Sequence, residues 1–146
     1  MGTVQTPNFE DVRVGDEVTP LQKCPDTRQL VMYAGASDDY VQIHYDKDQA
    51  VAAGHPSVIV HGALKSAFIA QMLTDWIGAA GRLVALEVSY RGIDYPGDTL
   101  TCRGRVTAKR QAKRPDGDRN LVDCDVWLEN SAGQVTTPGK ATVSMP

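Results

Sequence analysis

Residues 61–81 read HGALKSAFIAQMLTDWIGAAG, and this stretch decides which fold the chain can form. Large apolar side chains recur in it at intervals of three and four residues, so they lie on neighbouring stripes of one α-helix. The two stripes are Leu64, Phe68, Met72 and Trp76, and beside them Ile69, Leu73 and Ile77. Because so broad an apolar surface must be covered on most sides, the stretch predicts a long helix buried in the core.

Downstream of this helix the pattern changes to that of β-strands. Strands are predicted over residues 83–93, 99–108, 120–129 and 135–144, which are separated by the turn sequences YPGD, PDGD and SAG. They are expected to be consecutive antiparallel strands, with one further edge strand in the first 25 residues. The chain is therefore predicted to be an α+β domain, with the long helix on one face of a curved antiparallel sheet.

Two short helices are predicted upstream, each behind an aspartate that can accept hydrogen bonds from the first helical turn. Asp26 precedes a helix at about residues 27–34, which Gly35 is expected to end. Asp46 precedes a second short helix, which ends before Pro56 because proline disfavours helical conformation in the residue before it.

The composition of the chain indicates one globular domain. It has 146 residues, of which 42% are hydrophobic, and this is enough apolar material for one core. We therefore expect a single domain over residues 1–146. The net charge of −3 gives no basic footprint for nucleic acid. One local cluster is positive and is interpreted as a solvated loop: Lys109, Arg110, Lys113 and Arg114.

Cysteine usage and hydropathy indicate where the protein resides. Cys24, Cys102 and Cys124 follow no metal-binding or redox spacing, and no charged and then apolar leader precedes them. These features predict a reducing, cytoplasmic environment. The longest apolar stretch, residues 63–80, is not expected to span a membrane, because polar side chains interrupt it: Lys65, Ser66, Gln71, Thr74 and Asp75.

The loop between the two short helices carries a carboxylate and an imidazole, Asp39 and His44. On a regular helix these positions would lie roughly 140° apart around the axis and would not meet. In an irregular loop they can converge on one water and form an acid/base pair near neutral pH. From spacing alone, Asp38 and Asp39 also fit a solvated helix end, with His44 as a packed loop residue.

His61 and Gly62 open the long helix, where free backbone N–H groups and the helix dipole favour a developing negative charge. Gly62 would allow a ligand to approach closely, or it would let the helix pack tightly, and both interpretations stay open. His55 and His61 have no metal-binding spacing relative to Asp46 or Asp48, so no metal is predicted. The sequence has no GxSxG elbow, phosphate-binding glycine loop or dinucleotide fingerprint, and no cofactor is expected.

Residues 33–46, YAGASDDYVQIHYD, resemble the hydratase motif of MaoC-like dehydratases and (R)-specific enoyl-CoA hydratases. That motif reads Tyr-Ala-x-x-Ser-Gly-Asp-x-Asn-Pro-Ile-His-x-Asp, and Asp39 and His44 fall on its two catalytic positions. Residues 59–62, IVHG, are similar to the second signature of the family, and YPGDTL at residues 95–100 is similar to its Pro-Gly-Asp turn. The resemblance covers nearly the whole chain in the right order.

Two departures from the motif affect the loop. Val41 and Gln42 stand where the family usually has Asn-Pro, a pair that shapes the loop and lines the pocket. A different substrate preference, or weaker catalysis in a subunit that works beside another, would follow. Asp38 replaces the usual glycine and adds a like charge beside Asp39. Neither change removes a proton-transfer group.

The resemblance implies a hot-dog fold, in which an antiparallel sheet wraps a long central helix, and a dimer of identical chains or of two different hot-dog chains. It implies reversible hydration of trans-2-enoyl thioesters to (R)-3-hydroxyacyl thioesters, with coenzyme A or acyl carrier protein as the carrier. Asp39 and His44 would hold the water, and the Gly62 N–H would bind the thioester carbonyl. Substrate contacts are also expected from Tyr40, Val41, Val60 and His61.

Two alternatives to a hydratase stay open. The hot-dog fold also supports thioester hydrolysis with a carboxylate near the central helix. The chain could instead be an acyl-thioester-binding subunit that needs a partner, as the Val41-Gln42 departure suggests. The phosphates of the carrier are expected near the mouth of the pocket, beside the positive cluster at residues 109–114.

Overall fold

The computed structural model describes residues 6–146; residues 1–5, which the predicted domain includes, lie outside the described part. The described chain forms one five-stranded sheet, three α-helices and a short 3-10 helix. In chain order these are β1 (Glu17–Lys23), α1 (Thr27–Ser37), η1 (Gln42–His44), α2 (Lys47–Ala52), α3 (Gly62–Ile77), β2 (Arg82–Val88), β3 (Leu100–Ala112), β4 (Arg119–Glu129) and β5 (Val135–Met145).

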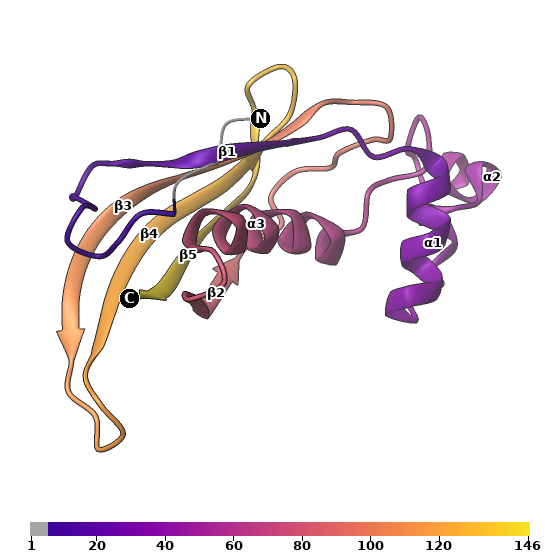
Figure 1. The fold of residues 1–146 in the computed structure, drawn as a ribbon. Coiled ribbons are helices and arrows are strands. Elements are labelled where there is room, and N and C mark those ends of the chain that lie inside the picture. The colour runs from indigo at the N-terminus through magenta and orange to yellow at the C-terminus, as the bar shows by residue number, and fades with distance from the viewer. Residues whose placement is uncertain (1–5) are drawn as a thin grey trace.

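The sheet is antiparallel throughout and has the strand order β1-β3-β4-β5-β2. It curves around α3, which lies against its concave face (Figure 1). The predicted α+β class, the buried long helix and the early edge strand are thereby confirmed.

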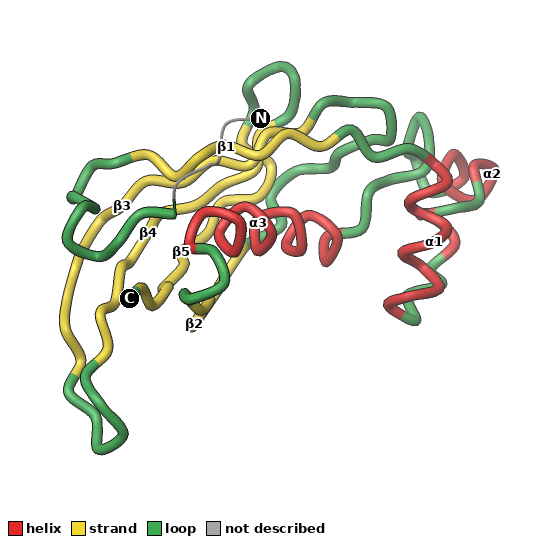
Figure 2. The backbone as a smooth tube through the Cα atoms, viewed as in Figure 1, coloured by secondary structure: helices red, strands yellow, loops and turns green. Residues whose placement is uncertain are grey.

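The expectation that successive strands are neighbours is wrong for β2. This strand pairs with β5 at the sheet edge opposite β1, and it ends at Val88. Residues 89–99, which we call the crossover segment, then pass from one edge to the other (Figure 2). Near its start, Arg91 and Gly92 donate backbone hydrogen bonds to Thr136 of β5, and near its end Gly97 donates to Pro25, just after β1. These bonds hold the segment across the N-terminal end of α3.

The core lies between α3 and the sheet. Strand residues alternate between the two faces, as the pleat requires, and on β4 the inward set is Val122, Cys124, Val126 and Leu128. The helix contributes both apolar stripes, all of them buried: Leu64, Phe68, Ile69, Met72, Leu73, Trp76 and Ile77. Burial of these side chains is the main source of stability of the fold.

Both predicted helix caps are present, but one helix end is wrong. Asp26 accepts a hydrogen bond from the Gln29 N–H at 2.8 Å, and Asp46 caps α2 in the same way. The first helix does not stop at Gly35, because the residue in left-handed conformation is Asp38, whose N–H bonds to the Ala34 carbonyl. Glycine is preferred at such a helix end, but aspartate also tolerates this conformation.

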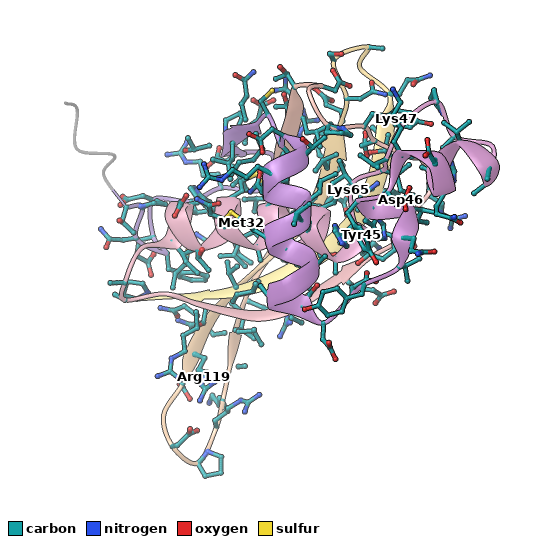
Figure 3. The ribbon with its side chains drawn as sticks, turned by 90° about the vertical axis from the view of Figure 1, so that its right-hand side faces the viewer. Met32, Tyr45, Asp46, Lys47, Lys65 and Arg119 are labelled. Atoms are coloured by element: carbon teal, nitrogen blue, oxygen red, sulfur yellow. The ribbon has the colours of Figure 1, made fainter. Side chains whose placement is uncertain are left out.

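The positive cluster lies at the far end of the molecule from α1 and α2. It belongs to the end of β3 and the hairpin that follows, which projects away from the helices (Figure 1). Figure 3 labels Arg119 on this hairpin, well away from Lys65, Tyr45 and Asp46. Lys109 is held by the carbonyl groups of Phe9 and Val12. The expectation that this cluster borders the substrate pocket is therefore wrong.

All three cysteines are free; Cys24 is exposed, whereas Cys102 and Cys124 are buried. Burial raises the pKa of both buried thiols to about 12. Within residues 6–146, no helix is long and apolar enough to cross a membrane.

Leu73→Ala is expected to lower the free energy of unfolding by about 2–5 kcal/mol, because Leu73 is fully buried and its truncation leaves a cavity. Gln71→Ala, at an exposed position on the same helix, is the control and should change it by less than about 0.5 kcal/mol. Urea denaturation measures both values. A loss below about 1 kcal/mol for Leu73→Ala would contradict the placement of α3 in the core.

Candidate active site

The candidate site lies where α1, η1 and α2 extend beyond the first turn of α3 (Figure 1). We call residues 27–52 the overhang. Two hydrogen bonds connect it to the extended segment before α3. The Ile59 N–H donates to the Ile43 carbonyl at 3.0 Å, and Nδ1 of His44 lies 2.8 Å from the Ile59 carbonyl oxygen. These contacts place the loop of the hydratase motif against the beginning of α3.

Asp38 ends α1 in a left-handed backbone conformation, with φ 57°. The hydratase motif usually has glycine at this position, and glycine adopts the conformation most readily, but aspartate tolerates it. The departure in the sequence therefore keeps the turn. Immediately after it, the Asp39 N–H donates to Ala34, and the Asp39 carboxylate accepts from the Val41 N–H at 3.3 Å. The turn and these bonds hold the carboxylate on the side of the loop that faces His44.

His44 ends η1 and is 8% exposed. Because a carbonyl oxygen can only accept a hydrogen bond, its contact with Ile59 places the proton of the neutral imidazole on Nδ1. Nε2 is then an acceptor, and it lies 3.8 Å from Oδ2 of Asp39. This distance is too long for a direct hydrogen bond, but one water between the two acceptors can donate to both. The structure thus brings together the two residues that the motif indicates.

His61 lies behind His44 and is fully buried. The two imidazole rings are stacked, with centroids 3.8 Å apart and an interplanar angle of 19°. Tyr33 contacts the His61 ring edge-on at a centroid distance of 5.0 Å. Among the described residues, neither ring nitrogen of His61 has a hydrogen-bond partner, which is unusual for buried polar atoms. His61 therefore supports the plane of the His44 ring, and its predicted contact with substrate stays a prediction.

Burial keeps His61 and the neighbouring Tyr33 uncharged at neutral pH. Burial lowers the pKa of His61 below the usual 6.5, and the charge that His44 can acquire lowers it further, while Asp39 opposes the shift. Burial also raises the pKa of the Tyr33 phenol, with smaller contributions from Tyr90 and Asp39. At neutral pH, His61 is therefore a neutral imidazole and Tyr33 keeps its proton.

Asp39, His44 and His61 offer ligand atoms that all lie within 4.8 Å of one another. A metal ion would need imidazole lone pairs, which lie in the ring planes, to point to one place. The stacked rings instead hold their planes nearly parallel, and Nδ1 of His44 is already bonded to Ile59. This arrangement suits proton transfer better than metal coordination.

A cavity of about 260 Å³ opens beside His44 and the first turn of α3. Its other lining residues come from the segment before α3, from α3 and from the crossover segment: Ile59, Val60, Gly62, Lys65, Tyr90, Arg91, Gly92 and Ile93. Gly62 is the first residue of α3, and the preceding His61 makes no side-chain capping bond. The backbone N–H groups of this first turn are therefore left available at the cavity wall.

The ring of Tyr90 packs directly on Gly62. A Cβ atom added at Gly62 would lie 2.9 Å from one ring carbon of Tyr90 and 3.0 Å from two others. The Tyr90 hydroxyl is 2.6 Å from Oγ of Ser66, one turn farther along α3, and Tyr90 is 54% exposed. The close packing at Gly62 therefore involves a side chain of the cavity wall and not the buried core.

Tyr40 and Val41, which are predicted to contact the substrate, are 59% and 55% exposed and do not line this cavity. Their role in substrate binding stays a prediction, whereas Val60 does lie on the wall. Together with other exposed side chains of the overhang they form what we call the apolar overhang surface: Val31, Met32, Tyr40, Val41, Tyr45 and Val51.

A larger hollow of about 530 Å³ lies elsewhere, over β2, β4 and β5. Its lining includes Glu87, Asp125 and Lys140, but none of the three histidines of the chain. The smaller cavity is the candidate site, because His44 and Gly62, the first residue of α3, both line it.

Two residues beside the cavity are not predicted from the sequence to belong to the site. In the sequence, Lys65 is only a polar interruption of an apolar stretch, and no sequence pattern singles out Asp94. The structure buries both and pairs them, with Nζ of Lys65 2.8 Å from Oδ2 of Asp94. A lysine on the buried side of an apolar helix is itself a signal, because a buried cation requires a partner.

A central helix packed in a five-stranded antiparallel sheet is the arrangement of the hot-dog-like (R)-hydratase fold. The sequence profile of the MaoC like domain family matches residues 6–123, and the chain belongs to this family. (R)-specific enoyl-CoA hydratases are among the proteins related to this chain.

Two relatives are similar in sequence. The 3-oxo-4,17-pregnadiene-20-carboxyl-CoA hydratase beta subunit of Mycobacterium tuberculosis is 30% identical over 95 residues, which are 65% of this chain and 74% of the relative. The (R)-specific enoyl-CoA hydratase of Rhodospirillum rubrum is 29% identical over 139 residues, which are 94% of this chain and 91% of the relative.

Solved structures are also similar in fold, and two of them illustrate the likeness. The (R)-hydratase of Aeromonas caviae involved in PHA biosynthesis superposes with a TM-score of 0.81 at 22% identity, covering 94% of this chain and 99% of that one. A chain of the ChsH1-ChsH2 complex from Mycobacterium tuberculosis gives 0.78 at 25% identity, covering 92% and 98%. The predicted hot-dog fold is confirmed by these likenesses.

The lowered pKa of His61 predicts that acid weakens folding. Below about pH 6.5 the unfolded chain binds a proton on this histidine, whereas the folded chain does so only below the lowered pKa, so stability falls as the pH falls. His61→Phe keeps a ring in the stack without the titration, and it should flatten the dependence. His55→Asn removes a histidine outside the stack and is the control. Urea denaturation between about pH 7.5 and 5 gives the slopes, and an unchanged slope for His61→Phe would contradict this prediction.

Proposed function

We propose that the chain catalyses the reversible hydration of trans-2-enoyl thioesters to (R)-3-hydroxyacyl thioesters. The observation that carries this proposal is the Asp39/His44 pair, with 3.8 Å between Oδ2 and Nε2, beside a cavity that the start of α3 borders. Membership in the MaoC like family and similarity to the Rhodospirillum rubrum hydratase support it. The acyl group is carried by coenzyme A or acyl carrier protein, and residues 1–146 act as a single domain.

Asp39 and His44 would orient the attacking water. The carboxylate of Asp39 and Nε2 of His44 both accept hydrogen bonds, so a water between them donates both of its protons and presents an oxygen lone pair to C3 of the substrate. As the O–C3 bond forms, His44 takes one proton, and the electrons of the double bond move onto the thioester oxygen. The Asp39/His44 pair then returns a proton to C2. Dehydration is the reverse sequence.

The beginning of α3 would stabilise the enolate-like oxygen of this reaction. The Gly62 N–H is one of the first helical N–H groups, which have no partner within the helix, and the helix dipole adds to its positive potential. A donor of this kind is typically worth on the order of 10²–10³ in rate. Val60 would contact the acyl group from the same wall. Tyr40, Val41 and His61 keep the substrate contacts expected from the motif.

A second proposal is that the chain works as one subunit of a two-chain hydratase. Its own support is the apolar overhang surface beside the site, together with the similarity to a hydratase beta subunit and to a chain of the ChsH1-ChsH2 complex. Several large apolar side chains left exposed on one part of a chain favour association with another chain. If a second copy covers this surface, the enzyme is a homodimer; if a different hot-dog chain covers it, the activity needs both chains.

Asp39→Asn and His44→Ala are each expected to lower turnover at least about 100-fold, because each removes a proton-transfer group while leaving the core intact. Asp38→Gly, which restores the usual motif residue next to Asp39, is the control and should stay active. The measurement is the loss of enoyl-thioester absorbance with crotonyl-CoA and with bulkier trans-2-enoyl-CoAs.

A folded Asp39→Asn or His44→Ala variant with near-native turnover would contradict the hydratase proposal. Release of free thiol from acyl-CoA would indicate a thioesterase instead. Turnover that depends on adding a second hot-dog chain would favour the two-chain proposal over the homodimer.

Gly62→Ala is expected to lower kcat/KM about 10- to 100-fold, because the added methyl group crowds the first turn of α3, where the thioester oxygen is proposed to bind. The same methyl group also displaces the Tyr90 ring, so Tyr90→Ala and the double variant are compared with it. We expect the double variant to stay as impaired as Gly62→Ala. If the double variant matches Tyr90→Ala, Gly62 serves only to accommodate the Tyr90 ring.

A further inference from the structure

A buried ion pair borders the candidate cavity, and its lysine, Lys65, is one of the lining residues. Lys65 and Asp94 are each 2% exposed, and Nζ of Lys65 lies 2.8 Å from Oδ2 of Asp94. Lys65 comes from the first turns of α3, and Asp94 comes from the crossover segment. The same ammonium donates to the Gly92 carbonyl at 2.9 Å, and Thr136 of β5 donates to Oδ2 of Asp94 at 2.6 Å. One pair thus connects the helix, the crossover segment and the sheet.

Stability of the fold does not account for this pair. Taking two charges out of water is costly, and replacing a buried ion pair by apolar residues of similar volume is often neutral or stabilising. The second carboxylate oxygen of Asp94 is also buried and has no hydrogen-bond partner among the described residues. A domain selected only for a stable core would place apolar side chains here, as it does at the other buried positions of α3.

Two consecutive hydrogen bonds connect the ion pair to His44. The backbone carbonyl of Asp94 accepts a hydrogen bond from the Val60 N–H at 2.9 Å. The carbonyl of the preceding residue, Ile59, holds Nδ1 of His44. At the other end of the pair, the Lys65 N–H donates to the His61 carbonyl and so closes the first turn of α3, which Gly62 begins.

The two segments on this path belong to no helix or strand. Residues 58–60 and the crossover segment therefore lack the ladder of hydrogen bonds that fixes a strand in place. Their positions depend on single contacts, of which the Lys65–Asp94 pair has the most partners and is the best shielded from water. Figure 3 shows Lys65 on the side of the molecule that the overhang occupies.

We propose that Lys65 and Asp94 are positioning residues for the active site. By fixing the crossover segment against α3, they set the position of the Ile59 carbonyl and with it the tautomer and ring orientation of His44. They also fix the first turn of α3 and the direction of the Gly62 N–H. The inference about catalysis depends on the proposed hydratase function; the inference about His44 does not.

The test is the double variant Lys65→Met/Asp94→Asn. It removes both charges at nearly constant volume and leaves an amide oxygen for Thr136, so that no buried charge is left without a partner. The control is Arg103→Met/Glu129→Gln, which removes another close ion pair, at 2.6 Å, on the partly exposed face of the sheet. Thermal unfolding first establishes that both double variants are folded.

Two readouts decide the proposal. The first is ¹⁵N NMR of the imidazoles, with the His44 signals assigned from their loss in His44→Ala. In the unaltered protein and in the control, Nδ1 is expected to be protonated and Nε2 not; in Lys65→Met/Asp94→Asn the two signals should move toward a tautomer average. The second is enoyl-CoA hydration, in which kcat should fall about 10- to 100-fold while KM stays within about threefold, because only the geometry of the reacting groups is lost.

Unchanged His44 signals together with an unchanged kcat in the folded double variant would overturn the proposal and leave the pair a purely structural role. A fall in KM and kcat together with unchanged His44 signals would also contradict it. If the unaltered protein has no hydratase activity, either alone or with a second hot-dog chain added, the proposed function fails, but the NMR comparison still decides whether the pair positions His44.

Discussion

The need to bury α3 on most of its circumference constrains the rest of this molecule. A helix with two adjoining apolar stripes cannot be covered by a flat sheet, so the strands curve around it and the long β3–β4 pair carries most of the curvature. The sheet covers the body of the helix but not its N-terminal end. The overhang, whose short helices are joined by loops, and the crossover segment, which belongs to no helix or strand, close that end. The N-terminus of α3 therefore lies outside the cover of the sheet, where its free N–H groups are available to a ligand.

The core and the candidate site are held together by different kinds of interaction. The core residues of α3 and the sheet interact through apolar packing, which tolerates change as long as volume is kept. The site instead depends on a few directed hydrogen bonds: Ile59 to His44, Asp94 to Val60, and Lys65 to Asp94 and Gly92. The stacked pair of His44 and His61 adds a further constraint, since a buried neutral ring holds the plane of the His44 ring, which is the proton acceptor in the proposed mechanism.

Local sequence patterns predict most of the helices and strands, but they predict few of the contacts between them. The spacing of Leu64 to Trp76 specifies α3, and the aspartates at residues 26 and 46 mark two helix starts, because these signals act over a few residues. The sheet edge that β2 joins is not encoded in β2 itself, since the alternation of side chains selects a face and not a partner strand. The motif names Asp39 and His44, but it gives no reason to expect His61 to stack behind His44. The Lys65–Asp94 contact spans 29 residues and joins two segments that no periodic pattern connects.

The unequal burial of the three thiols has a practical consequence for biophysical work on this protein. A thiol reacts as its thiolate, so two sulfurs that are shielded from solvent and whose pKa is raised to about 12 are inert toward maleimides at neutral pH. Cys24 is exposed and lies between β1 and the overhang, with its sulfur 3.7 Å from the Gly97 carbonyl of the crossover segment. The native chain thus offers one site for a fluorophore or spin label, at the junction where the sheet meets the segments that frame the active site, without any cysteine having to be removed.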